Sequence, residues 1–278
     1  MSGEKTAALT QKAPRPVNQT SVFKKRRRTL TLTLLAVAAV FMLAQIVTDY
    51  SVIGGFAAIP RAASWIFANF IPDEKAWSRL PNILTKLVET ALLSIAVTVC
   101  AAVFAFVFSL LGTRTTKANP FVGALVRIIG AFFRNVPDVV WAMLLMFSFG
   151  QNILTGFFAL FFYTFGSLVR TFIETIDEVS ASCVEALYAT GATFPQTVFQ
   201  AVVPSSMPEL VSWVLYMIET NIRNSTLIGV LTSTGIGALF DLYYKRLDYS
   251  SASLVVITIV VLVIIIEVLS NKIRKVIM

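Results

Sequence analysis

Long apolar stretches separated by short polar segments dominate this sequence. A helix needs about 20 mostly apolar residues to cross the hydrocarbon core of a bilayer. The first such stretch follows the basic cluster Lys24–Arg28 and ends before Asp49. We therefore predict an all-α polytopic membrane protein with six transmembrane helices, at 30–48 and at about 88–111, 135–150, 152–170, 208–230 and 249–267.

The distribution of basic residues predicts the orientation of these spans. An even number of spans places both termini on one side, and both ends of the chain are basic. Loops rich in Lys and Arg face the cytoplasm, so we expect both termini, and the loop carrying Arg114, Lys117, Arg127 and Arg134, to be cytoplasmic. The chain then divides into a basic tail (1–29), a first span (30–48), an extracytoplasmic segment (49–86), a region with the other five spans (87–271) and a basic end (272–278).

Composition excludes several classes of function. Hydrophobic residues make up 56% of the 278 residues and charged residues 14%, whereas soluble domains carry about 25% charged residues. Much of the net charge of +8 comes from the basic cluster beside the first span. Such a cluster is attracted to anionic lipid headgroups, so no nucleic-acid partner is expected.

The residue types present also argue against catalysis. With no histidine and two isolated cysteines, Cys100 and Cys183, the chain offers no Ser-His-Asp triad and no typical zinc site. It has no GxxxxGK[ST] phosphate-binding loop. We expect no cofactor, no metal and no ATP hydrolysis by this chain alone.

The segment 174–204 differs from an ordinary cytoplasmic loop because its pattern predicts two short helices. Ser180 or Ser182 is placed to cap a helix through Tyr188, and Gly191 is a natural helix stop because glycine adopts left-handed conformations. A second helix would begin near Thr193 and Pro195 and end at Pro204 and Pro208. Such an element either forms a docking surface for a partner or lies on the membrane surface, and the pattern alone leaves both open.

This segment resembles the EAA motif of ABC-transporter permeases. Glu185, Ala186, Gly191 and Pro204 match the motif, whereas Leu187, Ala201 and Val203 replace its third-position alanine, its isoleucine and its leucine. Two further stretches are similar to importer permeases: 134–142 resembles those for phosphonates and methionine, and 219–229 with 235–237 resembles those for phosphonates. The resemblance covers about Leu87 to Lys275.

The resemblance implies a type I ABC importer permease fold in a bacterial cytoplasmic membrane. It implies a homodimer that works with a cytoplasmic ATPase dimer and an extracytoplasmic substrate-binding protein. Coupling to the ATPase would rest on Glu185, Ala186, Gly191, Val203 and Pro204. The implied cargo is phosphonate or a related small phosphorus oxyanion, with methionine or phosphate as alternatives.

Charged and amide residues within the predicted spans are candidates for the translocation path. Glu219 and Arg223 are four residues apart and share one helix face, and charges in a span usually face protein or water. They either line the path or form a structural ion pair. The complete set of path candidates is Arg134, Asn135, Glu219, Asn221, Arg223 and Asn224.

Two other classes of function compete with an ATP-driven importer. A secondary transporter would carry coupling carboxylates deep in several spans, and Glu219 alone is clearly so placed. A membrane enzyme would need an acid–base set, but Asp138, Glu219 and Glu267 fall on different predicted spans. Both alternatives are therefore weaker than the importer.

Overall fold

The computed structural model describes residues 19–115 and 120–277, and its regular structure there is helical throughout. Internal contacts divide the chain into two units at Trp65 and Ile66. The first unit holds α1 (Gln19–Thr48) and most of α2 (Val52–Asn69). Residues 1–18 of the predicted basic tail, and Lys117 of the predicted cytoplasmic loop, lie outside the described residues.

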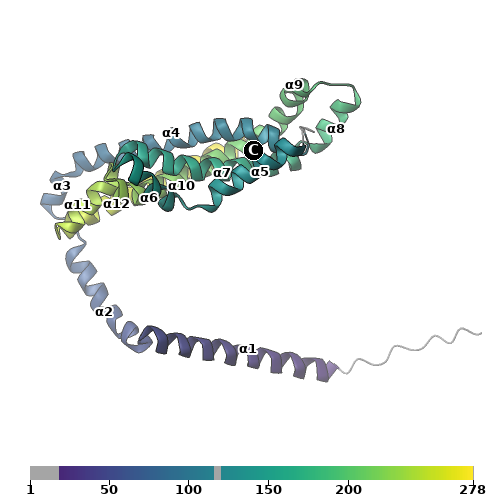
Figure 1. Ribbon diagram of the computed structural model, residues 1–278. Coiled ribbons are helices and arrows are strands. Elements are labelled where there is room, and N and C mark those ends of the chain that lie inside the picture. The colour runs from purple at the N-terminus through teal and green to yellow at the C-terminus, as the bar shows by residue number, and fades with distance from the viewer. Residues whose placement is uncertain (1–18, 116–119, 278) are drawn as a thin grey trace, which may run out of the picture. The chain divides into compact units, whose positions relative to one another are not determined.

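The second unit is a helix bundle (Figure 1). Its long central helix α7 packs against α4, α5, α6 and α10. One end of the bundle carries α8 and α9, and we call it the α8–α9 end; the opposite end carries α3 and α11. The elements are α3 (Glu74–Ser78), α4 (Leu80–Gly112), α5 (Pro120–Asn135), α6 (Asp138–Phe149), α7 (Ile153–Val179), α8 (Ala181–Ala189), α9 (Phe194–Thr197), the π-helical turn η1 (Val198–Val202), α10 (Val203–Thr232), α11 (Gly235–Lys245) and α12 (Tyr249–Ile277).

The number of spans depends on one broken helix. Within the described residues, five helical stretches are long and apolar enough to cross a membrane, at Arg26–Thr48, Leu80–Gly112, Ile153–Val179, Phe194–Thr232 and Tyr249–Ile277. The predicted third span corresponds to α6, whose 12 residues are fewer than the roughly 20 that a crossing needs. A sixth span results only if α5 and α6, bent by 88° relative to each other, count as one.

The predicted loop that carries Arg114, Arg127 and Arg134 is helical from residue 120 onward, so the loop conformation is wrong for most of this stretch. Residues 120–135 form the helix α5, which packs against α7 and α4. Its arginines lowered the apparent apolarity of the stretch, but they occupy one face, while Gly123, Val126 and Gly130 are buried on another. The break between α5 and α6 falls at Val136–Pro137 because proline disfavours helical conformation in the preceding residue.

The prediction that Pro204 and Pro208 end a helix is also wrong. The stretch Phe194–Thr232 runs on through η1 into α10. In η1 the Val203 N–H bonds to the Val198 carbonyl five residues earlier, so the backbone at Pro204 is not held to ordinary α-helical spacing. Pro204 itself lies in the first turn of α10, where no N–H donor is required.

An ion pair fastens the end of the bundle opposite the α8–α9 end. Arg79, before α4, contacts the Asp248 carboxylate at 2.5 Å and stacks over the Tyr243 ring. Burial acts to raise the pKa of Asp248. Hydrogen bonds from Arg79 and Ser251 outweigh burial, so the pKa lies below its ordinary value of 3.8. A carboxyl with a lowered pKa stabilises the folded state above its ordinary pKa, and this stabilisation is lost as the pH falls through the folded-state value.

We expect Asp248→Asn to lower the thermal unfolding temperature at pH 7. The difference from wild type should shrink as the pH falls below 3.8, because protonation then weakens the same ion pair in the wild type. Thermal unfolding in detergent at a series of pH values measures this. The exposed neighbour Glu74 supplies the control Glu74→Gln, and a pH-independent difference for Asp248→Asn would contradict the assignment.

Candidate coupling segment and translocation-path residues

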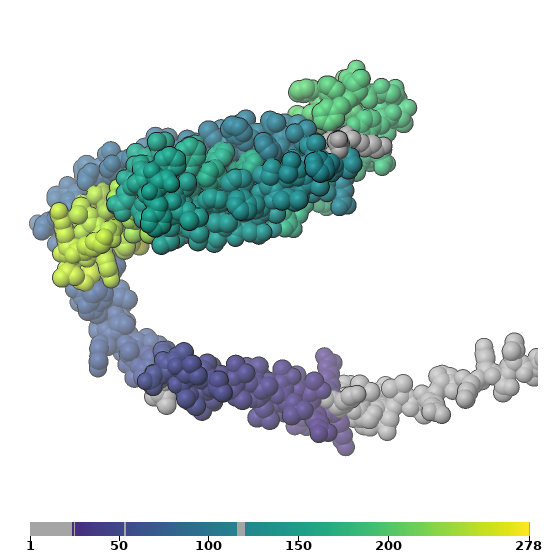
Figure 2. Space-filling model, in the orientation of Figure 1, coloured from purple at the N-terminus to yellow at the C-terminus, as the bar shows by residue number. Residues whose placement is uncertain are grey.

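The segment formed by α8, α9 and the turn between them stands out from the end of the bundle (Figure 2). Helix α8 begins after Ser180 and ends at Ala189, and α9 begins after Thr193, whose N–H donates to Gln196 Oε1 at 2.8 Å. Both short helices predicted from the sequence are therefore present. We call residues 180–202 the α8–α9 segment.

Gly191 forms the turn between the two helices. Its φ is +82°, a conformation that L side chains rarely adopt. The Gly191 N–H bonds to the Tyr188 carbonyl at 3.0 Å, and the Ala192 N–H to the Leu187 carbonyl at 3.2 Å. This bonding is a Schellman motif, which ends α8 and sets the direction of the following chain.

The apolar side of the α8–α9 segment packs against protein. Val184, Ala201 and Val202 are buried in one cluster with Ile176 of α7. The residues Cys183, Glu185, Ala186 and Gly191 are exposed, as is Pro204 at the start of α10, and Val203 is half-buried. Phe199, by contrast, is 73% exposed. The segment thus uses its apolar face for anchoring and presents a mixed face outward.

Glu219 and Arg223 contact each other on α10. Arg223 Nη2 lies 2.8 Å from Glu219 Oε1, and the arginine side chain is 51% exposed against 13% for the glutamate. Asn224 beside them is half-buried. The ion pair considered from the sequence is therefore present, and its arginine faces the outside of the single chain.

Asn221 lies in the interior of the bundle, unlike the other path candidates. It is 0% exposed, and its amide nitrogen donates to Thr98 Oγ1 at 2.8 Å and to Thr164 Oγ1 at 2.9 Å. The backbone carbonyl of Asn221 also accepts a hydrogen bond from Ser94 Oγ at 3.3 Å. The amide therefore joins α4, α7 and α10 within one chain and faces no open surface there.

We expect Asn221→Ala to destabilise the bundle by about 1–2 kcal/mol, the range for buried polar contacts between membrane helices. The loss follows because the side-chain amide bonds to Thr98 and Thr164 disappear while their hydroxyls stay buried. Thermal unfolding in detergent measures this loss of stability. The control is Asn224→Ala, three residues further along α10. Equal stability of the two variants would mean that the buried amide has no structural role.

Arg134 and Asn135 lie at the end of α5 beside α7. They line a cavity of about 460 Å³ whose other lining residues are Tyr163, Ser167, Arg170, Thr171 and Glu174. Arg134 also lines a second cavity with three more arginines, Arg114, Arg127 and Arg170. Neither cavity includes Glu219 or Arg223, so the path candidates from the sequence do not form one site in the single chain.

The arginine cluster was missed at the sequence level although a signal was present. Arg127 and Arg134 are seven residues apart, as are Arg170 and Asp177, and this spacing places each pair on one helix face. The spacing becomes informative only when residues 120–135 are known to be helical.

The comparison with known families decides what kind of protein this is. Residues 109–277 match the family described as binding-protein-dependent transport system inner membrane component. The chain belongs to this family. It is thus a permease component of an ABC transporter, a class in which a separate subunit hydrolyses ATP.

Several curated permeases are similar to this family member. It is 30% identical over 191 residues to the phosphate-import permease protein PhnE of Mycolicibacterium smegmatis, covering 69% of this chain and 36% of that protein. It is 30% identical over 189 residues to the phosphite transport system permease protein PtxC of Stutzerimonas stutzeri, covering 68% of this chain and 69% of that protein. The chain thus spans about a third of the first relative and about two thirds of the second.

Solved structures share the fold of this permease. The MetNI methionine ABC transporter in an inward-facing conformation matches with a TM-score of 0.58 at 22% identity, over 71% of this chain and 98% of that chain. An amino acid ABC transporter matches with a TM-score of 0.56 at 13% identity, over 70% of this chain and 96% of that chain. The fold is therefore that of type I ABC importer permeases.

Proposed function

We propose that this chain forms the translocation path of an ATP-driven importer for phosphonate or a related small phosphorus oxyanion. The cargo is supported by relatives named as phosphate-import, phosphite and phosphonate permeases. Permease for methionine is the alternative cargo assignment, and it is supported by the methionine transporter among the structural neighbours. An ion-coupled secondary transporter has no such support.

The permease works as a homodimer with a cytoplasmic ATPase dimer and an extracytoplasmic binding protein. Its N- and C-termini lie in the cytoplasm, on the side of the α8–α9 segment. In support, the end of α12 shares a cavity with Ser205 and Glu209 at the start of α10, so the C-terminus is near the α8–α9 segment. The division of the chain into an extra first span, the extracytoplasmic segment 49–86 and the core 87–271 belongs to the same proposal.

The observation that carries this proposal is the shape of the α8–α9 segment. Its outward face displays Glu185 and Ala186, and its Gly191 turn is fixed by two backbone hydrogen bonds. A rigid, anchored projection transmits a displacement of the ATPase to α7 and α10, to which it is directly joined. ATP binding then biases a two-state equilibrium between outward-open and inward-open paths.

Site-specific crosslinking tests the docking surface. Cys183 is exposed on the outward side of α8, and the second cysteine, Cys100, is also free. In a Cys100→Ser background, a homobifunctional maleimide should join Cys183 to a cysteine introduced on the partner ATPase. The background with Cys183→Ser is the control. Absence of any Cys183-dependent product with the co-expressed ATPase would contradict docking at this segment.

A further inference from the structure

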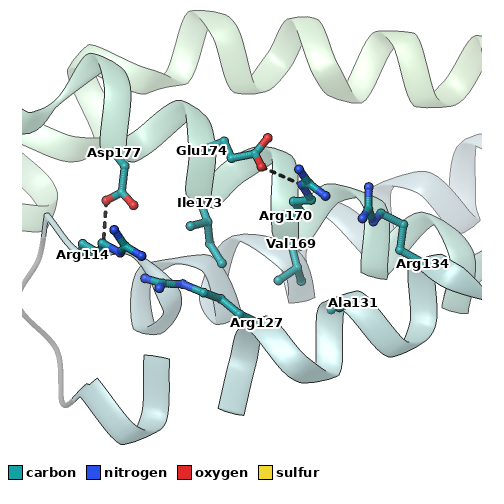
Figure 3. A pocket seen from close by; sticks show the side chains of 10 residues that line it. Arg114, Arg127, Ala131, Arg134, Val169, Arg170, Ile173, Glu174 and Asp177 are labelled. Atoms are coloured by element: carbon teal, nitrogen blue, oxygen red, sulfur yellow. Dashed lines mark hydrogen bonds and ion pairs between the residues drawn. The ribbon is translucent and has the colours of Figure 1, made fainter. Parts of the chain in front are cut away.

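A cavity of about 360 Å³ lies between α5 and α7 at the α8–α9 end of the bundle. One wall comes from α5, through Arg127, Gly130, Ala131 and Arg134. The other comes from α7, and Arg114 contributes from the segment after α4. Figure 3 shows the arginine side chains around this space. The remaining lining residues are Val169, Arg170, Ile173, Glu174 and Asp177.

The arrangement follows from the sequence spacing on two closely packed helices. The lining positions of α5 recur at intervals of three and four residues, and so do those of α7, which places each set on one face. The helices approach closely at Gly166, because glycine has no Cβ there. An added Cβ would lie 2.5 Å from the Arg134 backbone nitrogen. Gly130 and Ala131 add little bulk to the α5 wall, so the space between the arginines stays open.

The cavity carries an excess of positive charge. Four arginines and two carboxylates line it, which gives a formal charge of +2. Glu174 pairs with Arg170 at 2.6 Å. Asp177 instead accepts hydrogen bonds from Thr115 Oγ1 at 2.7 Å and from the backbone N–H of Arg114 at 2.9 Å. Within the described part of the chain, Arg114, Arg127 and Arg134 form no ion pair.

The individual arginines differ in how far their hydrogen bonding is satisfied. Arg127 donates from Nε and Nη2 to the Gly112 carbonyl at 3.0 and 2.6 Å, so its position is fixed by the backbone. The Nε of Arg134 is buried and has no hydrogen-bond partner among the described residues. Buried polar atoms are almost always paired, so this nitrogen lacks the acceptor that such atoms usually have among residues 19–115 and 120–277.

We propose that this cavity binds a tetrahedral phosphorus oxyanion through Arg134 and its neighbouring arginines. The planar guanidinium group matches the oxygen spacing of phosphate-type anions and forms paired charge-assisted hydrogen bonds with them. The volume lies at the lower end of the range of about 300–1,000 Å³ found for small-molecule sites. A doubly charged oxyanion also neutralises the excess of +2, and a singly charged one reduces it to +1.

The site is positioned to influence the α8–α9 segment. Asp177, in the cavity wall, lies three residues before Ser180, the N-cap residue of α8. Its carboxylate also holds the segment after α4 through Thr113 and Thr115. The bound group is either a free oxyanion or the headgroup of an anionic phospholipid, which share the same chemistry. Binding at this site does not depend on which cargo the transporter carries.

Two binding measurements on the purified full chain test the site and identify the source of the anion. Equilibrium dialysis with radiolabelled inorganic phosphate, in a maltoside detergent free of phosphate groups, measures the free oxyanion. Native mass spectrometry with added phosphatidylglycerol measures retained lipid. We expect Arg134→Gln to weaken phosphate binding, lipid binding or both by a factor of ten or more. Arg134→Lys, which keeps the charge, should weaken the same binding less.

The control is Arg246→Gln, which removes the same charge from an exposed position at the opposite end of the bundle. This variant should bind like the wild type, and all variants should retain the wild-type unfolding temperature. Loss of phosphate binding alone assigns the site to a free oxyanion, and loss of lipid alone assigns it to a headgroup. If Arg134→Gln binds both as the wild type does, or if Arg246→Gln is equally impaired, the site does not exist.

Discussion

Replacing Gly191 by proline is expected to reduce ATP-driven uptake to background while the protein still inserts into the membrane. Proline fixes φ near −65° and has no N–H, whereas Gly191 has φ +82° and donates to the Tyr188 carbonyl. The turn between α8 and α9 cannot form with these restrictions. Uptake and retention of the ATPase during purification are the two measurements.

The matched control for this variant is Gly191→Asn. A Cβ at this position would meet nothing within 4 Å, so any effect of a substitution comes from the backbone and not from packing. Asparagine tolerates positive φ better than other side chains, and we expect it to retain most of the uptake. Normal uptake by Gly191→Pro with its ATPase bound would show that this turn does not couple the subunits.

Gly237→Ala is expected to be the most destabilising single methyl addition in the bundle. A Cβ at Gly237 would overlap the Thr226 carbonyl oxygen and would lie 2.6 Å from the Val230 nitrogen. Both are backbone atoms of α10 and cannot move aside as the end of a side chain can. Overpacking typically costs about 1–3 kcal/mol, and we expect the upper end of that range or more, measured by thermal unfolding and folded yield.

Gly156→Ala, on α7, is the control for Gly237→Ala, which acts where α11 crosses α10. Gly156 is also buried in a helix, but its added Cβ would lie 3.5 Å from Ile228 Cγ2, an ordinary contact. Its stability should therefore be unchanged or slightly raised, since alanine favours helix over glycine. Similar stability of Gly237→Ala and Gly156→Ala would mean that the close approach of the two helices is not needed for folding.

The sequence predicts best those features that depend on local backbone chemistry. Gly191 marked the turn after α8, and the four-residue spacing of Glu219 and Arg223 placed both on one helix face, where they form an ion pair. The long apolar stretches likewise identified α1, α4, α7, α10 and α12 as candidate spans, because hydrophobic length is a property of the chain itself.

Features set by tertiary packing were not predicted. The sequence does not predict helix α5, because its arginines interrupt an apolar face that is buried only against α7 and α4. The interior position of Asn221 is not predicted, because a polar side chain in a span has two possible environments, and only the surrounding hydroxyls of Thr98 and Thr164 distinguish them. The continuation of the helix through Pro204 depended on the π-helical turn before it, which has no simple sequence pattern.

The most direct test of the proposed function is uptake into proteoliposomes that contain the permease with its ATPase and its binding protein. Radiolabelled methylphosphonate, phosphite, phosphate and methionine are compared with and without ATP on the side of the ATPase. We expect uptake of a phosphorus oxyanion that requires ATP and the binding protein and exceeds methionine uptake. Uptake by the chain alone, driven by an ion gradient and independent of ATP, would contradict the proposal.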